Sequence, residues 1–156
     1  MVRVDSLLSD VREFLAAEAR SLGAHLRVLP GLPEAELRCD PAQLRQVLIN
    51  LVLNAVQAVR ELPGSRRVVE LSADRRPEAI ALVVRDRGDG IPEEEIDRVR
   101  RAFYTSRRGG TGLGLAIAER FAEAHGGTIE LDNMEPYGFE ARVVLPIEPE
   151  AVKING

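Results

Sequence analysis

Apolar residues recur at helical spacing in three segments of the chain. The first helix is predicted over residues 6–22. Its apolar stripe consists of Leu7, Leu8, Val11, Phe14, Leu15, Ala19 and Leu22. The second helix is predicted over residues 40–62, because Asp40 is a favourable N-cap and a proline follows it at the first helical position. The third is predicted over residues 114–124 and ends at two glycines.

Two β-branched, apolar runs at residues 68–72 and 80–85 flank a polar turn, which is typical of a hairpin. Further strands are predicted over residues 25–29, 36–39, 128–131 and 140–145. A short helix is expected to begin at Ile91-Pro92, because the acidic residues that follow suit the positive end of a helix dipole. This order predicts an α/β fold, a two-layer sandwich in which helices cover one face of a mixed sheet.

Composition limits the class of protein. A chain of 156 residues with 45% apolar and 29% charged residues is typical of one soluble globular domain. No apolar run approaches the ~20 residues that a membrane span requires, and the N-terminus lacks the apolar core of a signal peptide, so a cytoplasmic location is expected. The net charge is −4, with 21 basic residues interleaved among 25 acidic ones, which argues against nucleic acid as the main partner.

Lysine and cysteine usage narrows the possible chemistry. Lys153 is the only lysine, whereas a Walker-type loop and a protein-kinase fold each need one at a defined place in the phosphate site. Any phosphate chemistry would therefore use backbone amides, arginine, side-chain amides and a metal. Cys39 is the only cysteine, and with His25 and His125 it makes too small a set for a zinc site. Cys39 is interpreted as a structural residue.

The helix predicted over residues 40–62 carries a polar stripe made almost entirely of carboxamides. At about 100° per residue it comprises Gln43, Gln46, Asn50, Asn54, Gln57 and Glu61. The stripe could be a solvated face, but such a face more often carries charged residues, and asparagine is a poor helix-interior residue. Carboxamide oxygens one turn apart are hard, neutral donors that can share Mg²⁺ with phosphates and water.

Two glycine-rich segments offer further candidate chemistry. Asp86-Arg87-Gly88-Asp89-Gly90 directly follows a predicted apolar strand and could be only a tight turn. A carboxylate at a strand end can also accept a hydrogen bond from an exocyclic amine such as that of adenine. Residues 109–115 lead directly into a predicted helix. The free backbone amides at a helix N-terminus can form an anion site. The alternative is that this segment is only a flexible hinge. Residues 109–115 lack the G-x-G-x-x-G spacing of a dinucleotide fold.

Four ordered segments together resemble the ATP-binding catalytic domain of bacterial sensor histidine kinases. This domain belongs to a superfamily with DNA gyrase, a heat-shock chaperone and MutL. Residues 46–55 are similar to the family's N box and Asp86-x-Gly88-x-Gly90 to its G1 box. Residues 103–107 are similar to its F box and residues 110–115 to its G2 box. The resemblance covers nearly the whole chain, and it implies the Bergerat fold, ATP or ADP as ligand and Mg²⁺ as metal.

By resemblance, Asn54 would hold Mg²⁺ with support from Asn50, and Asp86 would bind adenine in a pocket shaped by two glycines. Arg107 would act with the two asparagines in catalysis. Residues 93–110 would form the ATP lid. The nucleotide-binding residues that the resemblance implies are Asn50, Asn54, Asp86, Gly88, Gly90, Ile91, Thr105, Gly110, Thr111, Gly112, Leu113, Gly114 and Leu115.

The residue type at position 50 distinguishes the subfamilies of this superfamily. By resemblance, ATP-hydrolysing members such as gyrase and MutL, and the related serine kinases, carry a glutamate general base at this position. An amide cannot take a proton at neutral pH, so Asn50 suits transfer to an imidazole that is already nucleophilic. A protein histidine kinase is therefore expected. The alternatives are a serine kinase or ATPase of the same superfamily and a non-catalytic nucleotide-sensing module.

No phosphoacceptor histidine is evident. The family motif is a histidine followed by an acidic residue, whereas His25 precedes Leu26 and His125 precedes Gly126. His125 is expected to cap the last helix. Residues 1–156 are therefore interpreted as a catalytic domain that is separate from its dimerisation and phosphoacceptor domain. That domain and a response regulator are the expected partners, and no membrane contact is expected.

Overall fold

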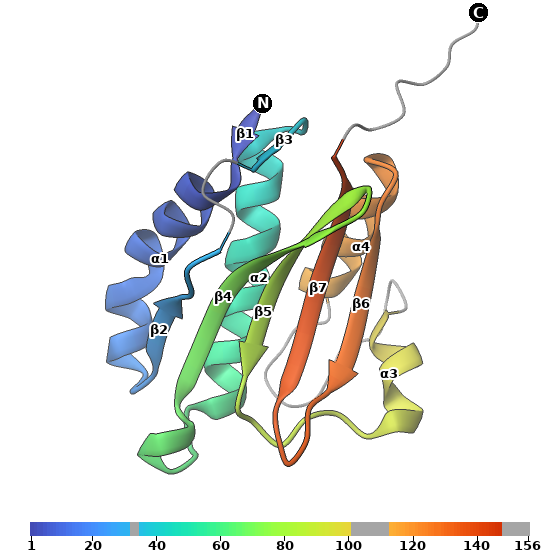
Figure 1. Cartoon of the computed structure of the whole chain (residues 1–156). Coiled ribbons are helices and arrows are strands. Elements are labelled where there is room, and N and C mark those ends of the chain that lie inside the picture. Colours follow the sequence, from blue (N-terminus) through green and yellow to red (C-terminus); the bar gives the residue numbers. More distant parts are fainter. Residues whose placement is uncertain (32–34, 101–112, 148–156) are drawn as a thin grey trace, which may run out of the picture.

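A five-stranded sheet forms one layer of the protein. The computed structural model describes residues 1–31, 35–100 and 113–147 (Figure 1). The strands lie in the order β2-β4-β5-β7-β6, with β2 parallel to β4 and the other neighbouring pairs antiparallel. Their bounds are His25–Val28 (β2), Val68–Arg76 (β4), Ala79–Asp86 (β5), Thr128–Asn133 (β6) and Phe139–Pro146 (β7). The prediction of a mixed sheet is confirmed.

Helices form the second layer on one face of this sheet (Figure 1). Helices α1, α2 and α4 pack against the strands, and the short helix α3 contacts α4. The bounds are Val4–Ser21 (α1), Pro41–Val59 (α2), Glu93–Arg100 (α3) and Leu113–Ala124 (α4), with a 3-10 turn, η1, at Gly64–Arg66. Within the described residues, no helix is both long and apolar enough to cross a membrane. The predicted two-layer α/β sandwich is confirmed.

Strand alternation directs the core face of the sheet toward the helices. In β5, Ile80, Leu82 and Val84 are at most 3% exposed and lie in the same core as the buried face of α2. Asp86 is the next residue in this alternation, so its side chain also points toward the helix layer.

Helix α2 begins where the sequence predicts. The Asp40 carboxylate accepts hydrogen bonds from the N–H groups of Ala42 (2.9 Å) and Gln43 (3.2 Å). These bonds satisfy N–H groups that have no partner within the helix. The helix ends at Val59, earlier than the predicted end at Leu62.

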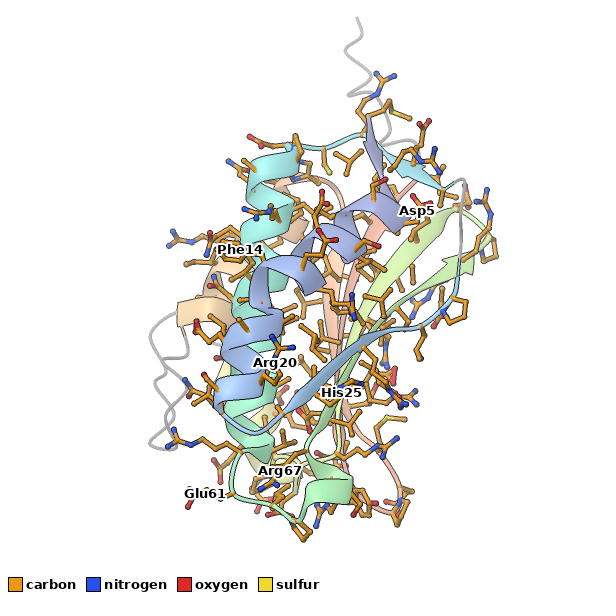
Figure 2. The ribbon with its side chains drawn as sticks, turned by 90° about the vertical axis from the view of Figure 1, so that its left-hand side faces the viewer. Asp5, Phe14, Arg20, His25, Glu61 and Arg67 are labelled. Atoms are coloured by element: carbon orange, nitrogen blue, oxygen red, sulfur yellow. The ribbon has the colours of Figure 1, made fainter. Side chains whose placement is uncertain are left out.

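Phe14 does not belong to the buried stripe of α1, contrary to the prediction. Its side chain is 59% exposed, whereas Leu7, Val11 and Leu15 are at most 5% exposed. At 100° per residue Phe14 falls at the edge of the stripe, and the guanidinium carbon of Arg45 lies 4.6 Å from its ring centroid. A cation therefore covers part of the ring in place of the core. Figure 2 shows Phe14 on the flank where α1 and α2 lie side by side.

The N-terminus forms a strand that the sequence did not predict. Strand β1 (Val2–Arg3) pairs antiparallel with β3 (Glu36–Leu37), and the Val4 N–H donates to the Ala35 carbonyl at 3.0 Å. Each strand is only two residues long and the partner is distant in sequence. No local pattern could indicate such a pair.

His125 lies in the turn after α4 and has the capping role that was predicted for it. The His125 backbone N–H donates to the Phe121 carbonyl, and the His125 Nδ1 lies 2.9 Å from the same oxygen. The imidazole packs on the Phe121 ring with centroids 4.2 Å apart. The Gly127 N–H then donates to the Ala122 carbonyl at 2.7 Å, which ends the helix. His125 is thus engaged in ending α4.

Candidate functional site

Asp86, the last residue of β5, is a buried carboxylate without a cation bonded to it. Its side chain is 5% exposed, and it forms no ion pair within the described part of the chain. Glu140 is equally buried but pairs with Arg85 at 2.9 Å and Arg142 at 3.1 Å. Burying a charge without a partner is unfavourable. Asp86 is therefore a candidate for recognising a ligand.

Burial raises the pKa of Asp86 from its ordinary value of 3.8 to about 6. Hydrogen bonds from the backbone N–H groups of Gly88 and Phe139 act in the opposite direction, and so does the positive charge of Arg66. The Gly88 N–H donates to Asp86 Oδ1 at 2.7 Å. The carboxylate is therefore ionised at neutral pH and can accept further hydrogen bonds.

Gly88 brings the segment after β5 against the last turn of α2. A Cβ atom at Gly88 would lie 3.3 Å from the Ala58 carbonyl oxygen and 3.0 Å from Asp86 Oδ1. A larger residue would push the segment away from the helix. Ala58 lies one helical turn after Asn54, so Asp86 and the carboxamide stripe of α2 border the same region.

The carboxamide stripe is partly engaged. Asn50 and Asn54 are both half-buried, while Gln57 is exposed. The Gln46 amide donates to Asn50 Oδ1 at 3.1 Å. No described residue forms a hydrogen bond with the Asn54 carboxamide. Within the described part of the chain, Asn54 thus offers the less engaged carboxamide oxygen.

The path from Gly90 to Ile91 is fixed by Asn133, a residue that the sequence analysis missed. Asn133 Nδ2 donates to the Ile91 carbonyl at 2.7 Å, and the Ile91 N–H donates to Asn133 Oδ1 at 2.9 Å. Gly90 has φ +80°, and a Cβ there would lie 2.4 Å from Asn133 Oδ1. Glycine is therefore required for both its conformation and its space. Asn133 gives no local signal, because its partner is 42 residues away.

Arg66 also holds the segment after Asp86, and the sequence did not predict this role. Its Nε donates to the Arg87 carbonyl at 2.9 Å, and its Nη2 donates to Asp89 Oδ1 at 3.0 Å. Its guanidinium carbon lies 4.0 Å from the ring centroid of Tyr137. Arg87 in turn donates to the Ser65 carbonyl at 3.0 Å. The turn after α2 and the β6–β7 hairpin thus hold the segment on two sides.

Helix α4 begins at Leu113, so the predicted residues Leu113 and Gly114 occupy its first turn, and Leu115 is buried. The other predicted phosphate-side residues lie outside the described residues: Thr105, Arg107, Gly110, Thr111 and Gly112. The predicted lid over residues 93–110 is described only to Arg100, as α3. The structure therefore places Gly88, two residues after Asp86, against the helix that carries Asn50 and Asn54, and it describes only part of the predicted lid.

The donor set fits Mg²⁺ only if a ligand supplies further oxygens. Within residues 1–31, 35–100 and 113–147, no three histidine, cysteine or acidic side chains are grouped as a metal cage. Asn54, with Asn50 beside it, supplies hard neutral oxygens of the kind that Mg²⁺ accepts. The remaining oxygen ligands would have to come from a bound phosphate group and water.

A cavity of about 430 Å³ lies elsewhere, between the start of α1 and the end of β2, where Val4, Leu8 and Val28 line it. Figure 2 shows this side of the molecule, with Asp5 and His25 labelled. No predicted site residue lines it, and its lining is mainly apolar.

The sequence of residues 39–149 matches the family model described as "Histidine kinase-, DNA gyrase B-, and HSP90-like ATPase". The chain is 32% identical to Sensor histidine kinase ZraS of Escherichia coli K12 over 94% of its own length. It is also 32% identical to Sensor histidine kinase WalK of Bacillus subtilis over 96% of its length. It spans only 30% and 24% of these relatives.

Solved structures agree in fold. The catalytic domain of histidine kinase ThkA superposes with a TM-score of 0.82 at 26% identity, covering 95% of each chain. Full-length ShkA in complex with AMPPNP superposes with a TM-score of 0.80 at 28% identity, covering 93% of this chain and 30% of that one.

Proposed function

Since this chain belongs to the histidine kinase-, DNA gyrase B- and HSP90-like ATPase family, we propose that it binds Mg-ATP and transfers the γ-phosphoryl group to a histidine. The histidine would lie on a separate dimerisation and phosphoacceptor domain, in two-component signal transduction. The observation that carries this proposal is the buried Asp86 carboxylate in a segment that packs, through Gly88, on the helix that carries the carboxamide stripe. A site of this kind can recognise a base at one end and a metal-bound phosphate at the other.

Asp86 would accept a hydrogen bond from the exocyclic amine of adenine. Its Oδ1 is already held by the Gly88 N–H, so the carboxylate is oriented before a nucleotide arrives. Gly88 and Gly90 would let the backbone approach the flat base. Guanine carries an oxygen in place of the amine, so its acceptor would oppose the carboxylate. The site therefore predicts a preference for adenine over guanine.

Asn54 is the better candidate for Mg²⁺, and Asn50 would support it. Asn50 Oδ1 already accepts a hydrogen bond from Gln46. When bound, Mg²⁺ would supply charge neutralisation at the phosphates. Asn50 cannot serve as a general base, so this site suits transfer to a nucleophilic imidazole over hydrolysis or serine phosphorylation. Arg107 and the glycine-rich residues 110–114 are proposed to neutralise and wrap the phosphates.

The acceptor domain, a response regulator and a cytoplasmic location remain part of this proposal. His25 precedes Leu26, and His125 is engaged in ending α4. Neither histidine fits a phosphoacceptor, so we propose that residues 1–156 act as one catalytic domain on a histidine supplied elsewhere. A non-catalytic nucleotide-sensing module would bind nucleotide in the same way but transfer nothing.

Calorimetric titration of ADP and GDP in EDTA tests the nucleotide site without the metal. We expect ADP to bind more tightly than GDP, and Asp86→Ala to weaken ADP binding by roughly 5–150-fold. This range corresponds to ~1–3 kcal/mol for a buried hydrogen-bonding group left unpaired. Asp89→Ala is the comparison in the same segment and should weaken ADP binding less, because this carboxylate is 74% exposed and Arg66 keeps its bond to the Arg87 carbonyl. Equal ADP affinity in wild type and Asp86→Ala would remove Asp86 from the site.

Asn54→Ala tests the metal role apart from the fold. Alanine is a better helix former, so α2 should keep its stability. ADP binding in EDTA should survive. The gain in ATP affinity on adding Mg²⁺ should fall by at least about tenfold, because even mutations of residues that only support a metal ligand cause losses of this size. Gln57→Ala, at an exposed position of the same stripe, should leave the Mg²⁺ dependence unchanged. If Asn54→Ala keeps the wild-type Mg²⁺ dependence, the stripe is only a solvated face.

A further inference from the structure

The turn of the β6–β7 hairpin touches the segment 86–91 at both of its ends. A Cβ at Gly138 would lie 2.6 Å from the Asp86 carbonyl oxygen, so only glycine allows this close approach. At the other end, the Asn133 side chain holds Ile91. The Met134 N–H donates to the Gly138 carbonyl at 2.8 Å and closes the turn between these two contacts.

The sheet register explains why one hairpin can reach both ends. Asp86 pairs with Phe139 across β5 and β7, and Phe139 pairs with Asn133 across β7 and β6. The segment after Asp86 therefore passes the end of β7 to reach Asn133. Figure 1 shows this connection running from β5 past β7 and β6 to α3.

The Asn133 side chain bonds to both backbone groups of Ile91, as the backbone of a neighbouring strand residue would. Its carboxamide supplies one donor and one acceptor, and the backbone of Ile91 uses both. The segment it holds contains two glycines, which have the largest conformational freedom of any residue. Without Asn133, Ile91 would have to bond to water, and the segment would sample more conformations.

We infer that Asn133 is a positioning residue for base recognition: by holding both backbone groups of Ile91, it keeps Asp86, Gly88 and Gly90 in the arrangement that selects adenine. This inference rests on the nucleotide site proposed above. Asn133 itself need not touch the nucleotide. Its effect comes from fixing the far end of the segment whose near end is the base-reading carboxylate.

The rival explanation is that Asn133 only stabilises the fold. A variant that is partly unfolded loses ADP and GDP binding in equal proportion, so the ratio of the two affinities stays constant. A variant whose segment is misplaced loses mainly the adenine preference. The ratio of ADP to GDP affinity therefore distinguishes positioning from stability.

The experiment is titration of the whole chain with ADP and with GDP in EDTA, for wild type, Asn133→Ala, Asn133→Asp and Asp132→Ala. Asp132 is the matched control, because it is the neighbouring residue and bonds to Arg142 on the opposite face of β6. We expect Asn133→Ala to lower the ADP-to-GDP affinity ratio by roughly tenfold, the lower end of the losses known for residues that support a site's ligands. Asn133→Asp keeps the acceptor for the Ile91 N–H but loses the donor, so its ratio should be intermediate. Asp132→Ala should keep the wild-type ratio.

Each outcome decides between the two explanations. If wild type prefers ADP and loses that preference in Asp86→Ala, but Asn133→Ala keeps it, the positioning role is wrong and the nucleotide site stands. If wild type shows no preference for ADP, the nucleotide proposal fails first. Should Asn133→Ala fail to fold, an unchanged ratio in Asn133→Asp overturns the inference equally well.

Discussion

Replacing Asp86 with asparagine should stabilise the protein at pH 8 and remove most of its adenine-nucleotide binding. The two effects have one cause, the burial of an ionised carboxylate. Burial raises the pKa of Asp86 from 3.8 to about 6. Because the folded state holds this proton more tightly than the unfolded chain, the free energy of unfolding falls as pH rises from about 4 to about 6. Above that range the ionised side chain costs about 3 kcal/mol.

Asparagine removes this cost while keeping one hydrogen bond. Its Oδ1 can still accept from the Gly88 N–H. Its amide nitrogen is less favourable near the Phe139 N–H, which now bonds to the carboxylate. We therefore expect a net gain of about 1–2 kcal/mol at pH 8, or roughly 3–6 °C in the melting temperature. The new amide also presents a donor where the adenine amine needs an acceptor, so ADP affinity should fall by at least about tenfold.

Thermal unfolding of wild type and Asp86→Asn at pH 8 and pH 4.5 measures the stability effect. The advantage of asparagine should be largest at pH 8 and should shrink at pH 4.5, where the wild-type carboxyl is mostly protonated. Glu140→Gln is a useful comparison, because this equally buried carboxylate has two arginine partners and should lose stability. A difference between wild type and Asp86→Asn that does not change with pH would show that ionisation of Asp86 is not its source.

Local patterns predicted most of the fold. The apolar spacing of α1 and the Asp40 cap of α2 depend on residues within a few positions of one another, and both were found. The family resemblance is confirmed by the match over residues 39–149. Phe14 was wrongly placed in the core, because periodicity gives the direction of a side chain and not the width of the surface that covers it.

Part of the site could be predicted because its chemistry is local. Asp86 and its glycines follow one strand, and the carboxamides follow one helix. The supports could not be predicted. Asn133 reaches Ile91 over 42 residues, and Arg66 reaches Asp89 over 23. Their positions follow from strand pairing, which no local pattern in these residues reveals.

Phosphoryl transfer should occur only when a separate acceptor domain is present, and the chain alone should show none. The chain contains no histidine that fits a phosphoacceptor, so the protein alone should bind ATP without acquiring label from its γ-phosphate. Catalysis would consist of positioning and charge neutralisation, so a separate acceptor that brings its own imidazole nucleophile should suffice. Asn50 cannot activate water, and hydrolysis in the absence of the acceptor should therefore be slow.

The most direct test is to mix the chain with γ-labelled ATP, Mg²⁺ and the proposed acceptor, a histidine-containing dimerisation domain that is expressed separately. We predict label on that domain alone, in an acid-labile and base-stable bond, and its reduction to background with Asp86→Ala or when the acceptor histidine is replaced by glutamine. Acid-stable label on the 156-residue chain itself, or rapid ATP hydrolysis without the partner, would contradict the assignment.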